Sequence, residues 1–157
     1  MANTTLTGND YGVNTFQLGG GEEIVNGGAR SNVFQVTRGT DQATINLSPA
    51  SGSKNEIDFL GDITDENLWL EQAGNDLKID LLGTNTSVTV NGWFSRSSSA
   101  LQEITAGGLK LDNQIAQLVQ AMASYSANNP GFDPGSAIAS TLPNDGALQN
   151  AVAAAWH

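Results

Sequence analysis

The stretch ENLWLEQAGNDLKIDLLGTNTSVTVNGWF, residues 66–94, decides the fold. Three runs carry apolar residues at every second position: Leu68 and Leu70 on either side of Trp69, and apolar residues alternating with polar ones at 77–81 and 88–90. This period of two is typical of half-buried β-strands. Glycine and asparagine separate the runs and supply the backbone conformations that tight turns need. The stretch therefore predicts a three-stranded β-meander.

Large aromatic side chains belong to the same stretch. Trp69, Trp93 and Phe94 carry the largest apolar areas of the chain, so we expect them to anchor the core of the meander. The stretch contains no nucleophile–base pair and no group of metal ligands. Its contribution is predicted to be structural.

Composition narrows the class of protein. The 157 residues fit one domain, and 16 acidic against 6 basic residues give a net charge of −10. This charge argues against nucleic acid and anionic membranes as partners, and it suits a soluble exported protein or one that takes up cations. The chain has no cysteine, no apolar run long enough to insert into a membrane, and no Sec signal peptide in MANTTLTGND.

A nine-residue repeat occupies residues 9–44. Its clearest unit is GGARSNVFQ, residues 27–35, and counting in nines from Phe34 places Phe16, Val25 and Ala43 at the same apolar position. The fourth position of successive units reads Gly12, Gly21, Arg30 and Gly39, and the sixth reads Asn14, Glu23, Asn32 and Asp41. Four units in one register indicate a repeated structural element.

Several blocks together resemble a known family. ENLWLEQAGNDLKIDLLGT, SVTVNGWF, LQEI and LVQAMA, within residues 57–122, resemble the haemolysin-type calcium-binding-related domain near the C-terminus of repeats-in-toxin (RTX) proteins. The nonapeptides resemble a degenerate form of the RTX pattern G-G-x-G-x-D-x-U-x, where U is a large apolar residue. The resemblance implies a β-roll, a solenoid in which two units complete one turn, so that residues eighteen apart stack. It also implies calcium held between turn carbonyls and sixth-position carboxylates.

The repeat register separates two edges of such a roll. Asn14 is expected to stack on Asn32, and a neutral pair of amides can form a hydrogen-bonded ladder without an ion. Glu23 is expected to stack on Asp41. The weak candidates for calcium are therefore Glu23, Asp41, Gly21 and Gly39, with Asn14 and Asn32 less favoured. A roll that folds without calcium remains the alternative.

The remaining segments predict further strands and two helices. Strands are expected at 43–47, 55–59, 101–104 and 109–111. Asp112 is expected to cap a helix whose apolar stripe is Ile115, Leu118, Val119 and Met122. Residues 128–135 break that helix, and a final one begins at Asn144 or Asp145 with Leu148, Val152 and Trp156 along one side. We expect one mainly β domain: a degenerate roll at 1–60, a meander cap at 61–111 and a helical tail at 112–157.

Function follows from the resemblance. The apolar, Ala-rich tail resembles the uncleaved export signals of type I secretion substrates. The expected protein is the non-catalytic C-terminal module of an RTX-type exported protein, which caps the roll, assists folding and contacts the type I secretion machinery and upstream domains of a parent protein. Its place would be outside the cell or on the cell surface. The alternative is an adhesin or carbohydrate-binding module that exposes Trp69, Trp93 or Arg96.

Catalysis is not expected. His157, the only histidine, is the last residue, so a Ser-His-Asp arrangement and multi-histidine metal sites are excluded. A hydrolase with a carboxylate pair is the remaining catalytic class. Its candidates are Asp58, Asp62, Asp65, Glu66 and Glu71.

Overall fold

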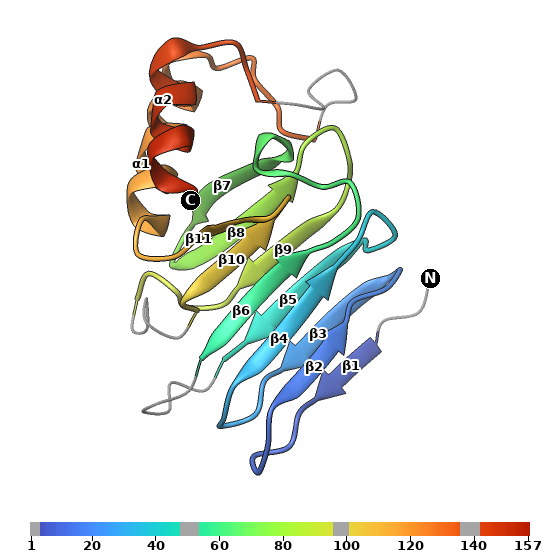
Figure 1. The fold of residues 1–157 in the computed structure, drawn as a ribbon. Helices are drawn as coiled ribbons and strands as arrows, with labels where there is room; N and C mark the ends of the chain where they lie inside the picture. The colour runs from blue at the N-terminus through green and yellow to red at the C-terminus, as the bar shows by residue number, and fades with distance from the viewer. Residues whose placement is uncertain (1–3, 48–53, 96–100, 136–141) are drawn as a thin grey trace.

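The computed structural model describes residues 4–47, 54–95, 101–135 and 142–157, and it has a mainly β fold of two sheets with two helices at one end (Figure 1). The first sheet contains, in spatial order, β1 (Thr4–Thr7), β3 (Glu22–Asn26), β5 (Gln42–Asn46), β9 (Ser87–Val90), β8 (Asp76–Leu81) and β7 (Leu68–Ala73). The second contains β11 (Leu109–Leu111), β10 (Glu103–Ala106), β6 (Asn55–Phe59), β4 (Asn32–Val36) and β2 (Asn14–Gln17). A short 3-10 helix, Asp65–Asn67, precedes β7.

Strands β1 to β6 alternate between the sheets, so that neighbours within each sheet are parallel. β9 and β10 extend the two sheets in the same parallel sense, by pairing with β5 and β6. In the second sheet Asn14 pairs with Asn32 and Phe16 with Phe34, which confirms the predicted spacing of eighteen. The rings of Phe16 and Phe34 stack with their centroids 5.1 Å apart.

The predicted spacing of eighteen is wrong in the first sheet. Glu23 pairs with Ala43 there, and Val25 pairs with Ile45. The turn between β4 and β5 spans residues 37–41, whereas the turn between β2 and β3 spans only 18–21. β4 is also one residue longer than β2, so the register is displaced by two residues; Asp41 falls in the turn before β5 and does not lie opposite Glu23 in the sheet.

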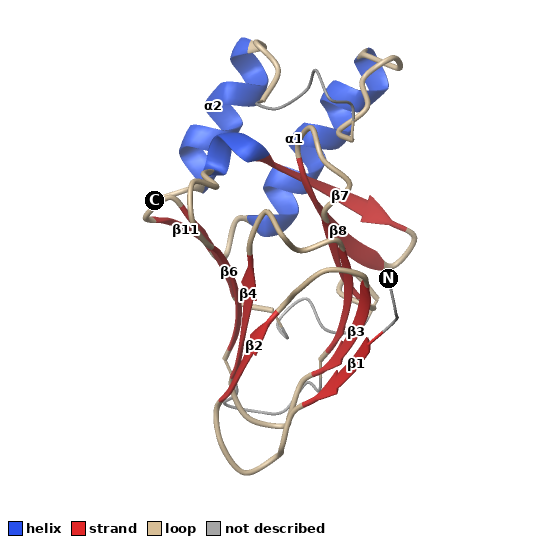
Figure 2. Cartoon of the chain, turned by 90° about the vertical axis from the view of Figure 1, so that its right-hand side faces the viewer, coloured by secondary structure: helices blue, strands red, loops and turns tan. Residues whose placement is uncertain are grey.

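The predicted meander is confirmed. β7, β8 and β9 are consecutive antiparallel strands, and Gly74 and Gly83 in the turns have positive φ angles of 65° and 75°. A second antiparallel pair, β10 and β11, turns at Gly107 and Gly108. Antiparallel strands therefore end both sheets on the side of the helices, as Figure 2 shows.

The core lies between the inner faces of the sheets and extends beneath the helices. Val25, Phe34, Ile45 and Ile57 have no exposed surface, because alternate residues of each strand point inward. Trp69 is 1% exposed and packs against the rings of Tyr125 and Phe132. The large aromatic area predicted to anchor the meander is thus buried, with Trp93 at 5% exposure and Phe94 packed against the cluster.

Helix α1 (Ile115–Asn128) packs against β7 and against α2 (Gly146–Ala155). The stripe Ile115, Leu118, Val119 and Met122 is buried, as its spacing predicts. The predicted cap at Asp112 is wrong, since the helix starts after Gln114 and the Asp112 carboxylate accepts a hydrogen bond from the neighbouring Asn113 N–H instead. No helix among the described residues is long and apolar enough to cross a membrane.

The last helix is fixed at both ends. Asp145 caps it by accepting a hydrogen bond from the Leu148 N–H at 2.9 Å, as predicted for this position. Beyond the helix, His157 exchanges two backbone hydrogen bonds with Lys110, at 2.8 and 3.0 Å. These bonds cover part of the outer edge of β11, which would otherwise be a free sheet edge.

Candidate functional site

Asparagines connect the parallel strands along one edge of the two sheets. We call it the asparagine edge: the turns at 8–13 and 27–31 and the side chains at 14, 26, 32, 46, 55 and 91. In the second sheet the Asn14 amide donates to Asn32 Oδ1 at 3.0 Å, and the Asn32 amide donates to Asn55 Oδ1 at 2.7 Å. The ladder predicted for Asn14 and Asn32 is therefore confirmed, and it extends by one strand.

A second ladder follows the first sheet at the same edge, and the nine-residue repeat gives no indication of it. The Asn91 amide donates to Asn46 Oδ1 at 2.6 Å, and the Asn46 amide donates to Asn26 Oδ1 at 3.0 Å. The Asn26 amide ends the ladder on the Thr7 hydroxyl at 3.5 Å. The sequence signal is an asparagine at or just after the end of β3, β5 and β9, at unequal spacings of 20 and 45 residues.

Asn32 also closes its own turn. Its amide nitrogen lies 3.0 Å from Gly28 O and 2.9 Å from Arg30 O, and its Oδ1 accepts from the Gly28 N–H at 3.0 Å. Asn55 Oδ1 is a third acceptor of the same nitrogen, which therefore has three oxygen acceptors for its two hydrogens. Gly28 also lets this turn pack against the turn at 8–13, since a Cβ there would lie 1.9 Å from Asn9 O.

The opposite edge, which we call the acidic edge, contains the turns at 18–21 and 37–41 with Glu23 and Asp41. Both carboxylates accept hydrogen bonds at 2.6 Å from one turn: Glu23 Oε1 from the Gly19 N–H and Asp41 Oδ2 from the Gly21 N–H. The structure thus brings Glu23, Asp41 and Gly21 to one turn, although Glu23 and Asp41 are not paired in the sheet. The Gly39 N–H donates to the Thr37 hydroxyl instead.

Threonines connect the turns of the acidic edge, and sequence reasoning did not identify them. The Thr40 hydroxyl donates to Leu18 O at 2.7 Å, and the Thr86 hydroxyl donates to Thr40 O. Both side chains are buried. No buried side-chain nitrogen or oxygen among the described residues lacks a hydrogen-bond partner.

The donor set at neither edge fits calcium well. Calcium takes six to eight oxygen ligands. The oxygens nearest the Asn32 amide nitrogen, Gly28 O, Arg30 O and Asn55 Oδ1, already accept hydrogen bonds from it. At the acidic edge one oxygen of each carboxylate already accepts a backbone hydrogen. In the described part of the chain, no cluster of three or more acidic or histidine side chains could hold a metal ion.

The carboxylates considered for hydrolysis do not form one site. Asp58 accepts a hydrogen bond from the Thr105 hydroxyl at 2.8 Å, and Asp62 pairs with Arg38 at 2.7 Å. Glu56 lies beside Asp58 on the outer face of β6. Its hydrogen bond with Asp58, together with partial burial and the nearby negative charges, raises the pKa of Glu56 to about 7.

Glu71 lies elsewhere, beside Asp80 on the first sheet. Burial, followed by the negative charge of Glu71, raises the pKa of Asp80 to about 7. Lys78 pairs with both carboxylates, at 3.6 and 3.7 Å, in a polar cavity of about 210 Å³. Because Glu71 and Asp80 are hydrogen-bonded to each other, they are too close for the carboxylate separation of about 5 Å or more that glycosidases use.

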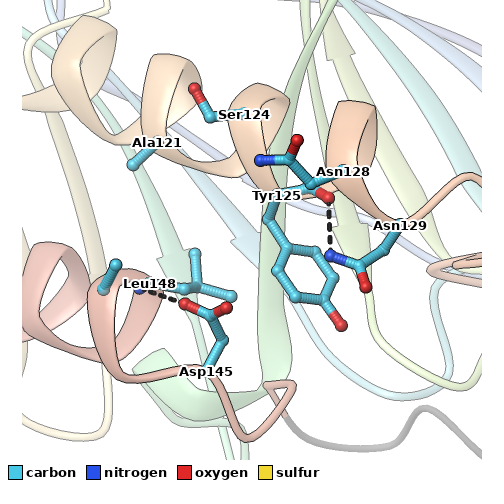
Figure 3. A pocket seen from close by; sticks show the side chains of 8 residues that line it. Ala121, Ser124, Tyr125, Asn128, Asn129, Asp145 and Leu148 are labelled. Carbon is cyan, nitrogen blue, oxygen red and sulfur yellow. Dashed lines mark hydrogen bonds between the residues drawn. The ribbon is translucent and has the colours of Figure 1, made fainter.

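A second cavity of about 210 Å³ lies between the two helices (Figure 3). The Asn129 amide at its wall donates to the backbone oxygen of Tyr125, and Asp145 is occupied in capping α2. It is smaller than the 300–1,000 Å³ usual for small-molecule sites, and its only acid already has a structural partner.

No family model matches the chain. Trp69 and Trp93, proposed above as exposed binding residues of an adhesin, are 1% and 5% exposed, so neither ring can serve as a binding platform. Arg96 lies outside the described residues. Among the described residues the two asparagine ladders connect β2, β4 and β6 in one sheet and β1, β3, β5 and the residue after β9 in the other.

Proposed function

We propose that this chain is a non-catalytic module that terminates a β-roll of an exported protein. The observation that carries the proposal is the difference between the two ends of the sheets. At one end the antiparallel strands β7, β8 and β11 and both helices complete the fold (Figure 2). At the other end both sheets finish in parallel edge strands, β1 and β2.

Termination is a physical need of such a coil. Each turn of the roll buries its apolar side chains only against neighbouring turns, so the last turn exposes core and unpaired backbone. The buried stripe of α1 meets this need, since Leu118 and Val119 are 1% and 3% exposed. The C-terminal residue adds to the cap by bonding the edge of β11.

Folding of this module is proposed to need no calcium at the asparagine edge. The amide of Asn32 satisfies the turn carbonyls that would otherwise face an ion. Glu23 and Asp41, with Gly21 and Gly39 nearby in the turns, remain the candidates for weak calcium binding. An ion there would compete with the backbone hydrogen bonds that the carboxylates already accept.

The tail is proposed to carry the type I export signal. Leu148, Val152 and Trp156 are 2%, 2% and 5% exposed in the folded protein. The export machinery would therefore read these side chains before the chain folds. The tail would act as a signal in the unfolded protein and as part of the cap after export.

Substitution of the cap tests the main proposal. Leu118→Asp places a charge in the buried stripe, and Gln117→Asp places the same charge on the exposed side of α1. We expect Leu118→Asp to open the capped end, bind a hydrophobic dye and form oligomers in light scattering, while Gln117→Asp stays monomeric. A monomeric Leu118→Asp protein with unchanged dye binding would overturn the capping function.

A separate experiment tests export. A reporter followed by residues 112–157 is expressed with a type I exporter, beside the same reporter carrying Val152→Asp and Trp156→Ser. Secretion of the first and retention of the second is the expected result. Equal secretion of both would remove the tail from the proposal and leave the capping role intact.

A further inference from the structure

The outer edges of β1 and β2 end the two sheets on the side away from the helices, and we call them the open end. Neither strand has a second strand partner in the part of the chain that the structure describes. Phe16, stacked on Phe34, keeps 8% of its surface exposed, whereas Phe34 keeps none. Tyr11 and Val13, in the turn between the two strands, are 92% and 69% exposed.

We propose that the open end binds a parallel pair of β-strands that carries an asparagine above each of the two ladders. This inference rests on the proposed function and names the partner of the uncapped end. The occupant is one further turn of the same coil, supplied by a segment with the chemistry of residues 22–41. It would pair one strand with β1 and the other with β2.

The hydrogen-bond direction of each ladder specifies this chemistry. In the second sheet each asparagine donates to the next strand toward the cap, so a strand added over β2 must donate to Asn14 Oδ1. That oxygen accepts the Asn9 N–H at 3.1 Å and has a second lone pair. In the first sheet the ladder ends on the Thr7 hydroxyl, which can donate to an acceptor above it. An asparagine side chain supplies both the donor and the acceptor.

The same directions disfavour a second copy of the chain at this end. A two-fold contact would run the edge strands antiparallel, so Asn14, at the start of β2, would face the end of the partner strand. The ladder would then have no donor at Asn14 Oδ1. A parallel strand keeps asparagine above asparagine and an apolar ring above Phe16, as β2 does with β4.

The test adds the missing turn to the protein. A copy of residues 22–41 is joined in front of residue 3, because in the parent Glu22 pairs with Gln42 and a strand with the register of β5 follows Asp41 directly. The control has aspartate in place of the copied Asn32, which cannot donate to Asn14 Oδ1 but also loses the bonds that close its own turn. A second variant therefore has alanine in place of the copied Asn26, which removes only the acceptor above the Thr7 hydroxyl. Hydrogen exchange of the β1 and β2 amides is measured in the parent, the extended chain, the control and the second variant.

We expect the extension to slow exchange in β1 and β2 by about tenfold or more, and the control and the second variant to lose most of this protection. Unchanged exchange, or an extension that proteases remove at once, would overturn the inference. So would a parent chain that sediments as a dimer whose β1 and β2 amides are already protected. These results are independent of the capping function, which Leu118→Asp tests at the opposite end.

Discussion

Asn32→Asp replaces the side-chain NH₂ group at the centre of the asparagine edge with a carboxylate oxygen. The side chain has no exposed surface, and its amide nitrogen faces Gly28 O, Arg30 O and Asn55 Oδ1 at 2.7–3.0 Å. A carboxylate cannot donate, so these acceptors lose their hydrogens and a negative charge lies among three oxygens. The carboxylate would keep the Gly28 N–H and the Asn14 amide as donors but would have no opposite charge beside it. Such a buried, unpaired charge costs about 3–5 kcal/mol, a large share of a domain's stability of about 5–15 kcal/mol.

Urea unfolding with excess EDTA measures this cost. With an m-value of about 2 kcal/mol/M, the midpoint should fall by about 1.5–2.5 M. Asn91→Asp is the matched control, because it makes the same change at an exposed residue with one ladder bond, at 2.6 Å. It should cost about 1 kcal/mol or less.

Calcium provides the second arm of this experiment. The parent protein should unfold at the same urea concentration in EDTA and in calcium, since the Asn32 amide already satisfies the turn. Asn32→Asp should recover part of its loss in calcium, because the new carboxylate and the turn carbonyls supply oxygen ligands. Glu23→Gln with Asp41→Asn removes the carboxylates of the acidic edge. If this variant still lost more than about 1 kcal/mol in EDTA, an ion and not the amide would hold the Asn32 turn, and the reasoning would be refuted.

Three further predictions concern other parts of the molecule. Gly28→Ala should destabilise the protein by about 2–4 kcal/mol in urea unfolding, since its Cβ would lie 1.9 Å from a backbone oxygen, while Gly19→Ala meets no atom within 4 Å and should be tolerated; equal effects would contradict the close approach. The raised pKa of Asp80 means that the folded state binds more protons than the unfolded state between about pH 4 and 7, so this group should make stability fall by about 4 kcal/mol as pH rises through the window; Asp80→Asn should remove this part of the pH dependence and leave that of Glu56. Deletion of His157 should lower the free energy of unfolding by about 1–2 kcal/mol because two backbone hydrogen bonds to β11 are lost, whereas His157→Ala retains them; a deletion no worse than the alanine variant would remove the residue from the cap.

Local patterns in the sequence predicted most of the elements. Alternating apolar residues identified β7, β8 and β9, and the apolar spacing of α1 identified its buried stripe. The predicted N-cap of α1 was wrong because the Asp112 carboxylate accepts a hydrogen bond from the Asn113 N–H. Residue type alone does not show which N–H group a carboxylate binds. Cap preferences state which side chains can accept, not which backbone N–H they reach.

The sequence predicted the Asn14–Asn32 pair but not the position of Glu23, because the strands and turns of the repeat differ in length. A constant repeat of nine requires a constant length of strand plus turn. The steps from β2 to β3 and from β3 to β4 are eight and ten residues, which sum to the eighteen that pairs Asn14 with Asn32. The longer turn before β5 breaks the repeat, so the register of Glu23 was misplaced. The ladder through Asn46 joins residues twenty and forty-five apart, and no local pattern specifies such pairings.

The asparagine edge and the acidic edge differ in the hydrogen bonds that their side chains can form between neighbouring turns. An asparagine both donates and accepts, so a column of asparagines satisfies itself at every turn without an ion. A carboxylate only accepts, and two stacked carboxylates need a cation or separate donors. Here the separate donors are the Gly19 and Gly21 N–H groups, while threonine hydroxyls make the connection between turns. The described residues therefore meet the hydrogen-bonding needs of both edges with their own atoms, and an ion at either edge would have to displace bonds that are already formed.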